Sequence, residues 1–101
     1  MLDYERRQQT LIVRLSDELD HRAAGRMREE LDALLRDGSI RRLVLDLKDL
    51  RFMDSSGVGL IIGRSKLMAR RGGSVAVMHA DARMDRIFEM SGLYELVERM
   101  A

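Results

Sequence analysis

The sequence contains no cysteine, no proline and no tryptophan, and its only aromatic side chains are two tyrosines and two phenylalanines. The absence of cysteine excludes both a disulfide framework and a thiolate metal site. The only two histidines, His21 and His79, lie in no cluster with ligand spacing, so we expect no metal site. With so few aromatic residues, the core has to be built from aliphatic and methionine side chains.

Long apolar runs and one-sided charge are also absent. No run approaches the roughly 18 residues of a membrane span, and the first ten residues, MLDYERRQQT, lack the pattern of a secretory signal. We therefore expect no membrane association and a cytoplasmic location. The 18 basic and 17 acidic residues are spread along the chain with a net charge of +1, which excludes the basic field needed for sequence-independent nucleic-acid binding.

The 101 residues, of which 46% are hydrophobic and 35% charged, predict one folded domain over residues 1–101. Short runs rich in Val, Ile and Leu at residues 10–15, 43–47 and 74–78 predict strands that are buried on both faces, as in parallel sheets covered by helices. A weaker extended segment at residues 2–6 is expected to pair antiparallel with the first of them as an edge strand.

Between the strands the apolar residues recur with a helical period. The first helix is expected to start after Asp20 and end before Gly38, the second to stop near residues 72–73, and the third to run from Asp81 to Gly92. Residues 94–100, YELVERM, fit either a helical turn or a last strand, with a slight preference for the strand. The order predicts an α/β fold with a mostly parallel sheet of four or five strands and three or four helices.

Polar residues follow the strands at the edge where such sheets carry their functional sites. They are Asp20 and His21 after the second strand, Asp54 and Ser55 after the third, and His79 and Asp81 after the fourth.

Two catalytic or ligand-binding interpretations of these residues are weak. A serine hydrolase could use Ser55 with His79 and Asp81, or with Asp20 and His21, but the G-x-S-x-G nucleophile motif is absent. The segment GVGLIIGR suggests a glycine-rich nucleotide loop, yet Ile62 stands where the dinucleotide fingerprint needs a small residue. Gly57, Gly59 and Gly63 are better explained by close helix packing or exposed backbone amides.

The segment FMDSSGVGLIIGR, residues 52–64, places two serines where the second helix begins. One serine can cap the helix while the other hydroxyl faces solvent, or both can be caps; the residues alone do not decide which. A phosphate on such a hydroxyl would be tolerated, since helix N-termini bind anions. The serine could then control binding through charge without moving the backbone.

This segment, together with ELDH at residues 18–21, LVLDLKDLRFMDSSG and IFEMSGL, resembles the STAS-domain anti-sigma factor antagonists, and most closely the sporulation, sigma F branch of that family. The resemblance spans nearly the whole chain. It implies a phosphorylatable regulatory protein that is not an enzyme and needs no cofactor. Such a protein acts as a partner switch, and we expect it to be monomeric when free.

In such a switch the unphosphorylated antagonist binds an anti-sigma factor with serine kinase activity and releases the sigma factor. Phosphorylation ends the binding, and a PP2C-type phosphatase reverses it. The resemblance implies that Ser55 is the phosphorylated residue. The partner surface implied by the resemblance and by the sheet edge comprises Asp20, His21, Asp54, Ser55, Ser56, Gly57, Val58 and Gly59. An antagonist of the general stress, sigma B type or a signalling-complex scaffold is the alternative.

The sequence departs from the family pattern at two places. Asp17 stands where relatives often have a glycine before ELD, and aspartate tolerates turn conformations. Relatives often continue into a further C-terminal helix, so we expect the fourth helix to be short or missing.

Overall fold

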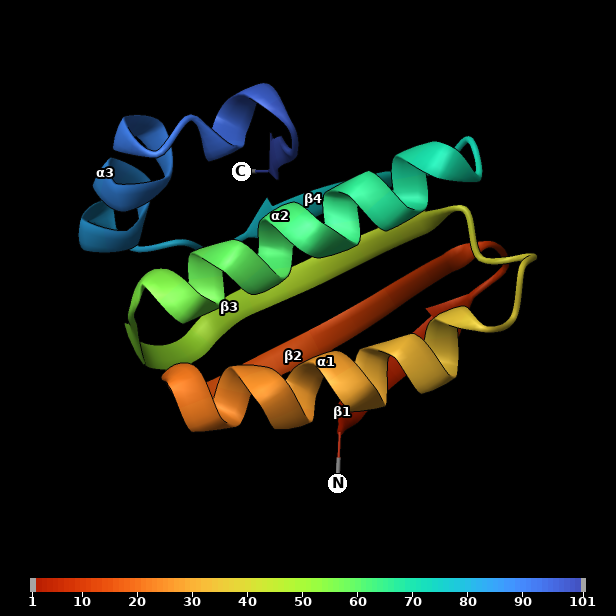
Figure 1. Ribbon diagram of the computed structural model, residues 1–101, viewed down its shortest axis with the longest axis horizontal. Coiled ribbons are helices and arrows are strands. Elements are labelled where there is room, and N and C mark those ends of the chain that lie inside the picture. Colours follow the sequence, from red (N-terminus) through yellow and green to blue (C-terminus); the bar gives the residue numbers. More distant parts are fainter. Residues whose placement is uncertain (1, 101) are drawn as a thin grey trace.

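A five-stranded sheet with the order β1-β2-β3-β4-β5 forms the centre of the computed structural model, which describes residues 2–100 (Figure 1). The strands are β1 (Asp3–Arg7), β2 (Thr10–Leu19), β3 (Arg42–Met53), β4 (Ser74–Met78) and β5 (Glu98–Met100). β1 pairs antiparallel with β2, and all other neighbours are parallel. The mostly parallel sheet with an antiparallel edge strand is therefore confirmed.

Helices connect the strands in the expected order. They are α1 (His21–Leu35), α2 (Ser55–Arg70) and α3 (Ala82–Met90), followed by the short 3₁₀ helix η1 (Leu93–Glu95). Gly72 and Gly92 follow α2 and α3 with φ of 75° and 77°, a conformation that glycine adopts without strain. The last segment contains both expected structures, because the 3₁₀ turn precedes the three residues of β5.

β2 and β3 are longer than their apolar runs. The segment KDLRFM, which follows the apolar run at residues 43–47, is the second half of β3, and its Leu50 and Met53 are buried. The pairing of β2 with β3 shifts register between Arg14 and Ser16 and again between Asp17 and Glu18. These irregularities let polar residues face solvent while the strands continue to pair. Asp17 has φ 64°, a left-handed turn conformation that aspartate tolerates.

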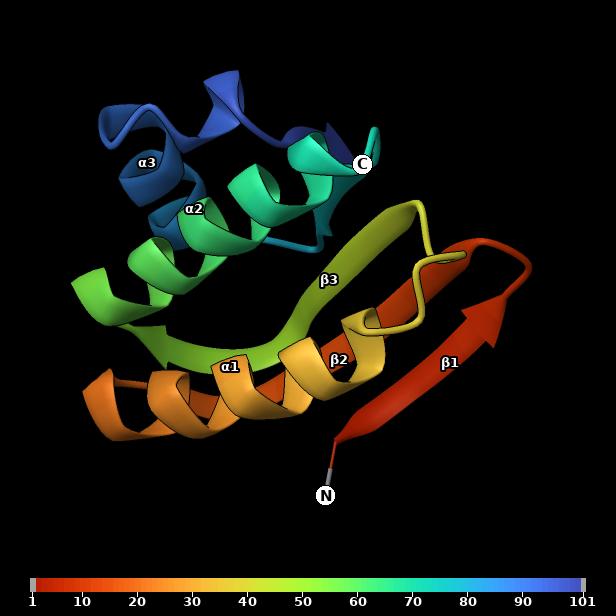
Figure 2. The ribbon, with the colours of Figure 1, turned by 45° about the vertical axis from the view of Figure 1, so that its right-hand side comes forward.

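The helices gather their apolar side chains into one core on one face of the sheet. α1 and α2 lie side by side against this face (Figure 2), and Met84 and Phe88 of α3 join the same cluster. Alternate residues of β2, such as Ile12 and Arg14, point to the opposite face and are only partly buried. The expectation that every central strand is buried on both faces was therefore wrong for β2.

Candidate functional site

The parallel strands bring the N-termini of α1 and α2 together at one edge of the sheet. β2 ends at Leu19 and β3 at Met53, and each is followed by a single residue before its helix. The backbone N–H of Asp54 donates to the carbonyl of Leu19 at 3.4 Å, and Nδ1 of His21 lies 3.2 Å from Oγ of Ser56. The expectation that Asp20 and His21 lie at the same sheet edge as Asp54 and Ser55 is confirmed.

An aspartate caps each of the three α-helices. Asp20 accepts a hydrogen bond from the N–H of Ala23 at 2.9 Å, and Asp81 accepts one from the N–H of Met84 at 2.8 Å, so both expected caps are confirmed. The expectation that one of the two serines caps α2 was wrong. Asp54 is the N-cap and accepts from the N–H of Ser56 at 2.8 Å.

Replacing Asp54 with alanine is expected to lower the free energy of unfolding by about 1 kcal/mol, since that is the usual cost of losing an N-cap side chain. Urea unfolding of the purified variant measures the change. Glu29→Ala is the matched control, because Glu29 is an exposed acidic residue within α1 and caps no helix. Equal stability of wild type and Asp54→Ala would show that the carboxylate is not needed to start α2.

The two serines differ in their surroundings because Asp54 takes the capping position. Ser55 is the first residue of α2 and is exposed, and its hydroxyl makes no hydrogen bond to any other residue of the described range 2–100. Ser56 is half-buried and its hydroxyl is hydrogen-bonded to His21. Of the neighbouring positions, Gly57 and Val58 are buried, whereas Gly59 is exposed. The structure therefore separates two hydroxyls that the sequence left equivalent.

The residues considered for a serine hydrolase do not form a triad. Nδ1 of His79 donates to Oδ1 of Asp46 at 2.9 Å, while Asp81 is occupied as the cap of α3. His21 contacts Ser56 rather than Ser55, and Asp20 is occupied as the cap of α1. No carboxylate of the described chain therefore orients a histidine toward a serine in the way a catalytic triad requires.

The Asp46–His79 pair is a structural feature that the sequence did not reveal. Asp46 lies in β3 with 8% of its surface exposed, and His79 follows β4 with φ 63°. Burial alone raises the pKa of the Asp46 carboxyl. The hydrogen bonds from His79 and from the Lys48 amide together outweigh the effect of burial. They hold the pKa of Asp46 below its ordinary value.

The lowered pKa of Asp46 predicts that the protein loses part of its stability in acid. A carboxyl whose pKa is lowered by folding stabilises the protein above its unfolded pKa of about 4, and the contribution is lost as the pH falls through the folded pKa. The stability difference between wild type and Asp46→Asn should therefore be largest above about pH 5 and shrink toward pH 3. Urea unfolding across this range tests it, with Asp49→Asn at an exposed position of β3 as control. A difference that does not change with pH would contradict the assignment.

The described residues 2–100 contain no helix with the length and apolar character needed to cross a membrane. The same residues contain no group of three or more histidine, cysteine, aspartate or glutamate side chains placed to hold a metal ion.

Comparison with known proteins agrees with the fold and the site described above. The sequence profile of the STAS domain matches residues 1–101. The anti-sigma F factor antagonist of Paenibacillus polymyxa is 41% identical over 95% of this chain and 82% of its own length. The anti-sigma-B factor antagonist of Bacillus subtilis (strain 168) is 30% identical over 96% of this chain and 87% of its own length.

Solved structures agree with this assignment. The anti-sigma factor antagonist SpoIIAA in its unphosphorylated form superimposes with a TM-score of 0.81 and 26% identity, covering 100% of this chain and 88% of that one. SpoIIAA of Bacillus in its phosphorylated form gives a TM-score of 0.79 with 28% identity, covering 100% and 92%.

The fold and the paired helix N-termini define a small α/β domain of the STAS class. The chain belongs to the STAS domain family and, within it, to the anti-sigma factor antagonists. Antagonists of this family are regulatory proteins, and the chain is accordingly not an enzyme.

Proposed function

We propose that this protein is the switchable component of a partner switch that controls a sigma factor. In its unphosphorylated form it binds an anti-sigma factor that is also a serine kinase, and the sigma factor is released. The kinase transfers the γ-phosphoryl group of ATP to Ser55, which ends the binding, and a PP2C-type phosphatase removes the phosphate. The relatives named as antagonists, and the existence of SpoIIAA in phosphorylated and unphosphorylated forms, support this proposal.

The observation that carries the proposal is the position of the Ser55 hydroxyl. It is exposed, it has no hydrogen-bond partner within residues 2–100, and it lies in the first turn of α2. The free N–H groups and the dipole at a helix N-terminus favour a phosphate there. A kinase can therefore reach the hydroxyl without unfolding the helix. Ser56 is a poorer acceptor because the residue is half-buried and its hydroxyl is hydrogen-bonded to His21.

The proposed docking surface surrounds Ser55. It combines the exposed His21 and Gly59 with the half-buried Asp20, Asp54 and Ser56. Gly57 and Val58 are buried in the free protein, so their contribution would be to hold the start of α2 in place beneath the contacting residues. Such a surface needs no rearrangement of the sheet to accept a partner.

We propose sigma F and the control of sporulation as the pathway, because the anti-sigma F antagonist is 41% identical and the anti-sigma-B antagonist 30%. The general stress pathway or a signalling-complex scaffold is the second candidate. Such transcription control would place the protein in the cytoplasm. Affinities for purified anti-sigma factors of the two pathways distinguish the candidates, and tighter binding to the sigma B type would transfer the assignment.

Incubation with the cognate anti-sigma kinase and ATP tests the phosphorylation directly. Intact mass should rise by one phosphate, and peptide mapping should place it on Ser55. Ser55→Ala should remain unmodified, while Ser56→Ala serves as the matched control and should still be phosphorylated. Modification of Ser55→Ala to the same extent as wild type would contradict the assignment of the acceptor.

A further inference from the structure

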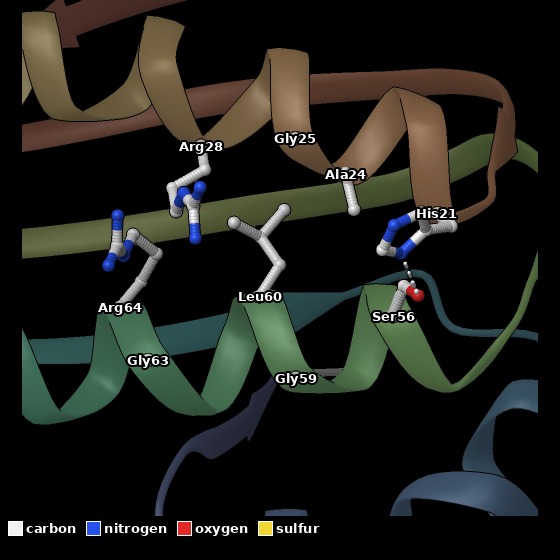
Figure 3. A pocket seen from close by; sticks show the side chains of 9 residues that line it. All are labelled: His21, Ala24, Gly25, Arg28, Ser56, Gly59, Leu60, Gly63 and Arg64. Carbon is white, nitrogen blue, oxygen red and sulfur yellow. Dashed lines mark hydrogen bonds between the residues drawn. The ribbon is translucent and has the colours of Figure 1, made fainter.

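A groove between α1 and α2 shares His21, Ser56 and Gly59 with the proposed docking surface and extends beyond it along the two helices. It is open to solvent on one side and has a volume of about 430 Å³ along the facing sides of the two helices (Figure 3). This volume is within the range of roughly 300–1,000 Å³ that is typical of small-molecule sites. His21 and Ser56 lie at one end, beside the proposed phosphorylation site, and Arg28 and Arg64 line the groove further along the helices.

The end of the groove with the two arginines carries excess positive charge. Figure 3 shows the side chain of Arg28 directed from α1 toward α2, and that of Arg64 directed from α2 toward α1. Arg64 has 12% of its side chain exposed and pairs with Asp32, but its Nε is buried without a partner in the described chain. Arg28 forms no ion pair with residues 2–100. Two guanidinium groups thus face one groove, and of the two only Arg64 is paired with a carboxylate of residues 2–100.

Such an arrangement fits an oxyanion. Guanidinium groups bind the oxygens of carboxylates and phosphates through paired, charge-assisted hydrogen bonds. An oxyanion between the two arginines would supply the missing negative charge and accept hydrogen bonds from the Arg28 guanidinium, which has no ion-pair partner in residues 2–100. The other lining residues fit the remainder of a small molecule. Leu60 and Ala24 form an apolar wall, and His21 and Ser56 offer polar groups at the far end.

Close packing of α1 against α2 does not explain the glycines that line the groove. An added Cβ at Gly25, Gly59 or Gly63 would meet no atom within 4 Å. Glycine is less favourable than alanine inside a helix, and all three residues line the groove. Their effect is to keep the space between the two arginines and the His21–Ser56 end open.

We propose that the α1–α2 groove binds a small molecule that carries a phosphate or carboxylate group, held by Arg28 and Arg64. The ligand would contact both helices whose N-termini form the docking edge. Its binding does not depend on the partner switch.

Titration of the ¹⁵N-labelled full chain with pyrophosphate, and separately with citrate, tests the proposal by NMR. The backbone amides of Gly25, Gly59 and Gly63 and the Nε–H of Arg64 should shift with saturation at millimolar probe. Arg28→Ala should weaken the binding by at least about tenfold, since it removes a hydrogen bond to a charged group. Gly59→Leu fills the groove without changing charge and should also prevent the shifts.

Arg26→Ala and Lys66→Ala are the matched controls, because each removes one exposed cation from α1 or α2 outside the groove. Both should bind as wild type does. Response to pyrophosphate alone assigns a phosphate ligand, and response to citrate alone assigns a carboxylate. Absence of groove shifts with both probes, or equal affinity of Arg28→Ala and wild type, would overturn the proposal. So would shifts confined to residues 54–57, which would indicate binding at the start of α2 only. None of these outcomes affects the kinase test of Ser55.

Discussion

Replacement of Ser55 by aspartate is expected to lower the affinity for the cognate anti-sigma factor by at least about a hundredfold. A partner with an acidic group opposite Ser55 would be repelled by the added carboxylate. One such like-charge pair at about 5 Å, with an effective dielectric constant of about 20, costs about 3 kcal/mol, which exceeds a hundredfold in Kd. A phosphoserine carries about −1.5 to −2 charges and approaches the roughly 5.5 kcal/mol that moves an equilibrium from mostly bound to mostly free. Isothermal titration calorimetry measures the change.

Ser74→Asp is the control for this prediction. Ser74 is also exposed, but it begins β4, at the end of the sheet opposite the carboxyl-terminal edge. Its replacement adds the same charge and should leave the affinity unchanged. Ser55→Asp should also be at least as stable as wild type, because a negative charge in the first turn of a helix is favourable. Unchanged anti-sigma binding of Ser55→Asp would remove the basis for the proposed switch.

Gly57→Ala is expected to destabilise the protein by about 1–3 kcal/mol, the usual cost of overpacking a core. An added Cβ would lie 2.4 Å from Cγ of Met53 and 3.1 Å from Cδ2 of Leu19. These side chains end the two strands that lead into the docking edge. Either the Met53 side chain would have to leave its place in the core, or the first turn of α2, with Ser55, would have to move away from the sheet. Urea unfolding measures the loss of stability.

Gly59→Ala on the same helix is the matched comparison. A Cβ at this position meets nothing within 4 Å, so the better helix propensity of alanine should raise the free energy of unfolding by about 0.5–1 kcal/mol. The two substitutions are chemically identical and two residues apart, yet their effects should have opposite signs. If Gly57→Ala is as stable as Gly59→Ala, α2 does not depend on close packing at Gly57.

The order of the elements could be predicted from the sequence because it depends on local patterns. Apolar periodicity marked the helices, and Asp20 and Asp81 marked two helix starts through contacts within three residues. The lengths of β2 and β3 could not be predicted in this way. Their outer halves contain polar residues and register shifts around Ser16 and Asp17, and only the neighbouring strand shows that pairing continues there.

The candidate site was predictable in its location and less so in its detail. Because parallel strands end at the same edge of a sheet, the order of the elements predicted that Asp20, His21 and Asp54 lie at one edge. Which residue caps α2 depends on where the helix begins, and the succession Asp54-Ser55-Ser56 offers three capping side chains in a row.

Contacts between residues that are far apart in the sequence could not be predicted from it. Asp46 lies within the apolar run LVLDL, and its partner His79 is 33 residues away, directly after the next strand. The groove with Arg28 and Arg64 depends on how two helices face each other across the sheet, and neither helix alone indicates it.

Comparison of the enzymatically phosphorylated protein with the unmodified protein tests the central claim most directly, namely that charge on Ser55 changes binding and leaves the fold intact. Calorimetry with the anti-sigma factor should show an affinity lower by more than about a hundredfold. Amide NMR spectra of the free phosphoprotein should change only near the start of α2. Retained affinity, or spectral changes throughout β2, β3 and the core, would contradict the account.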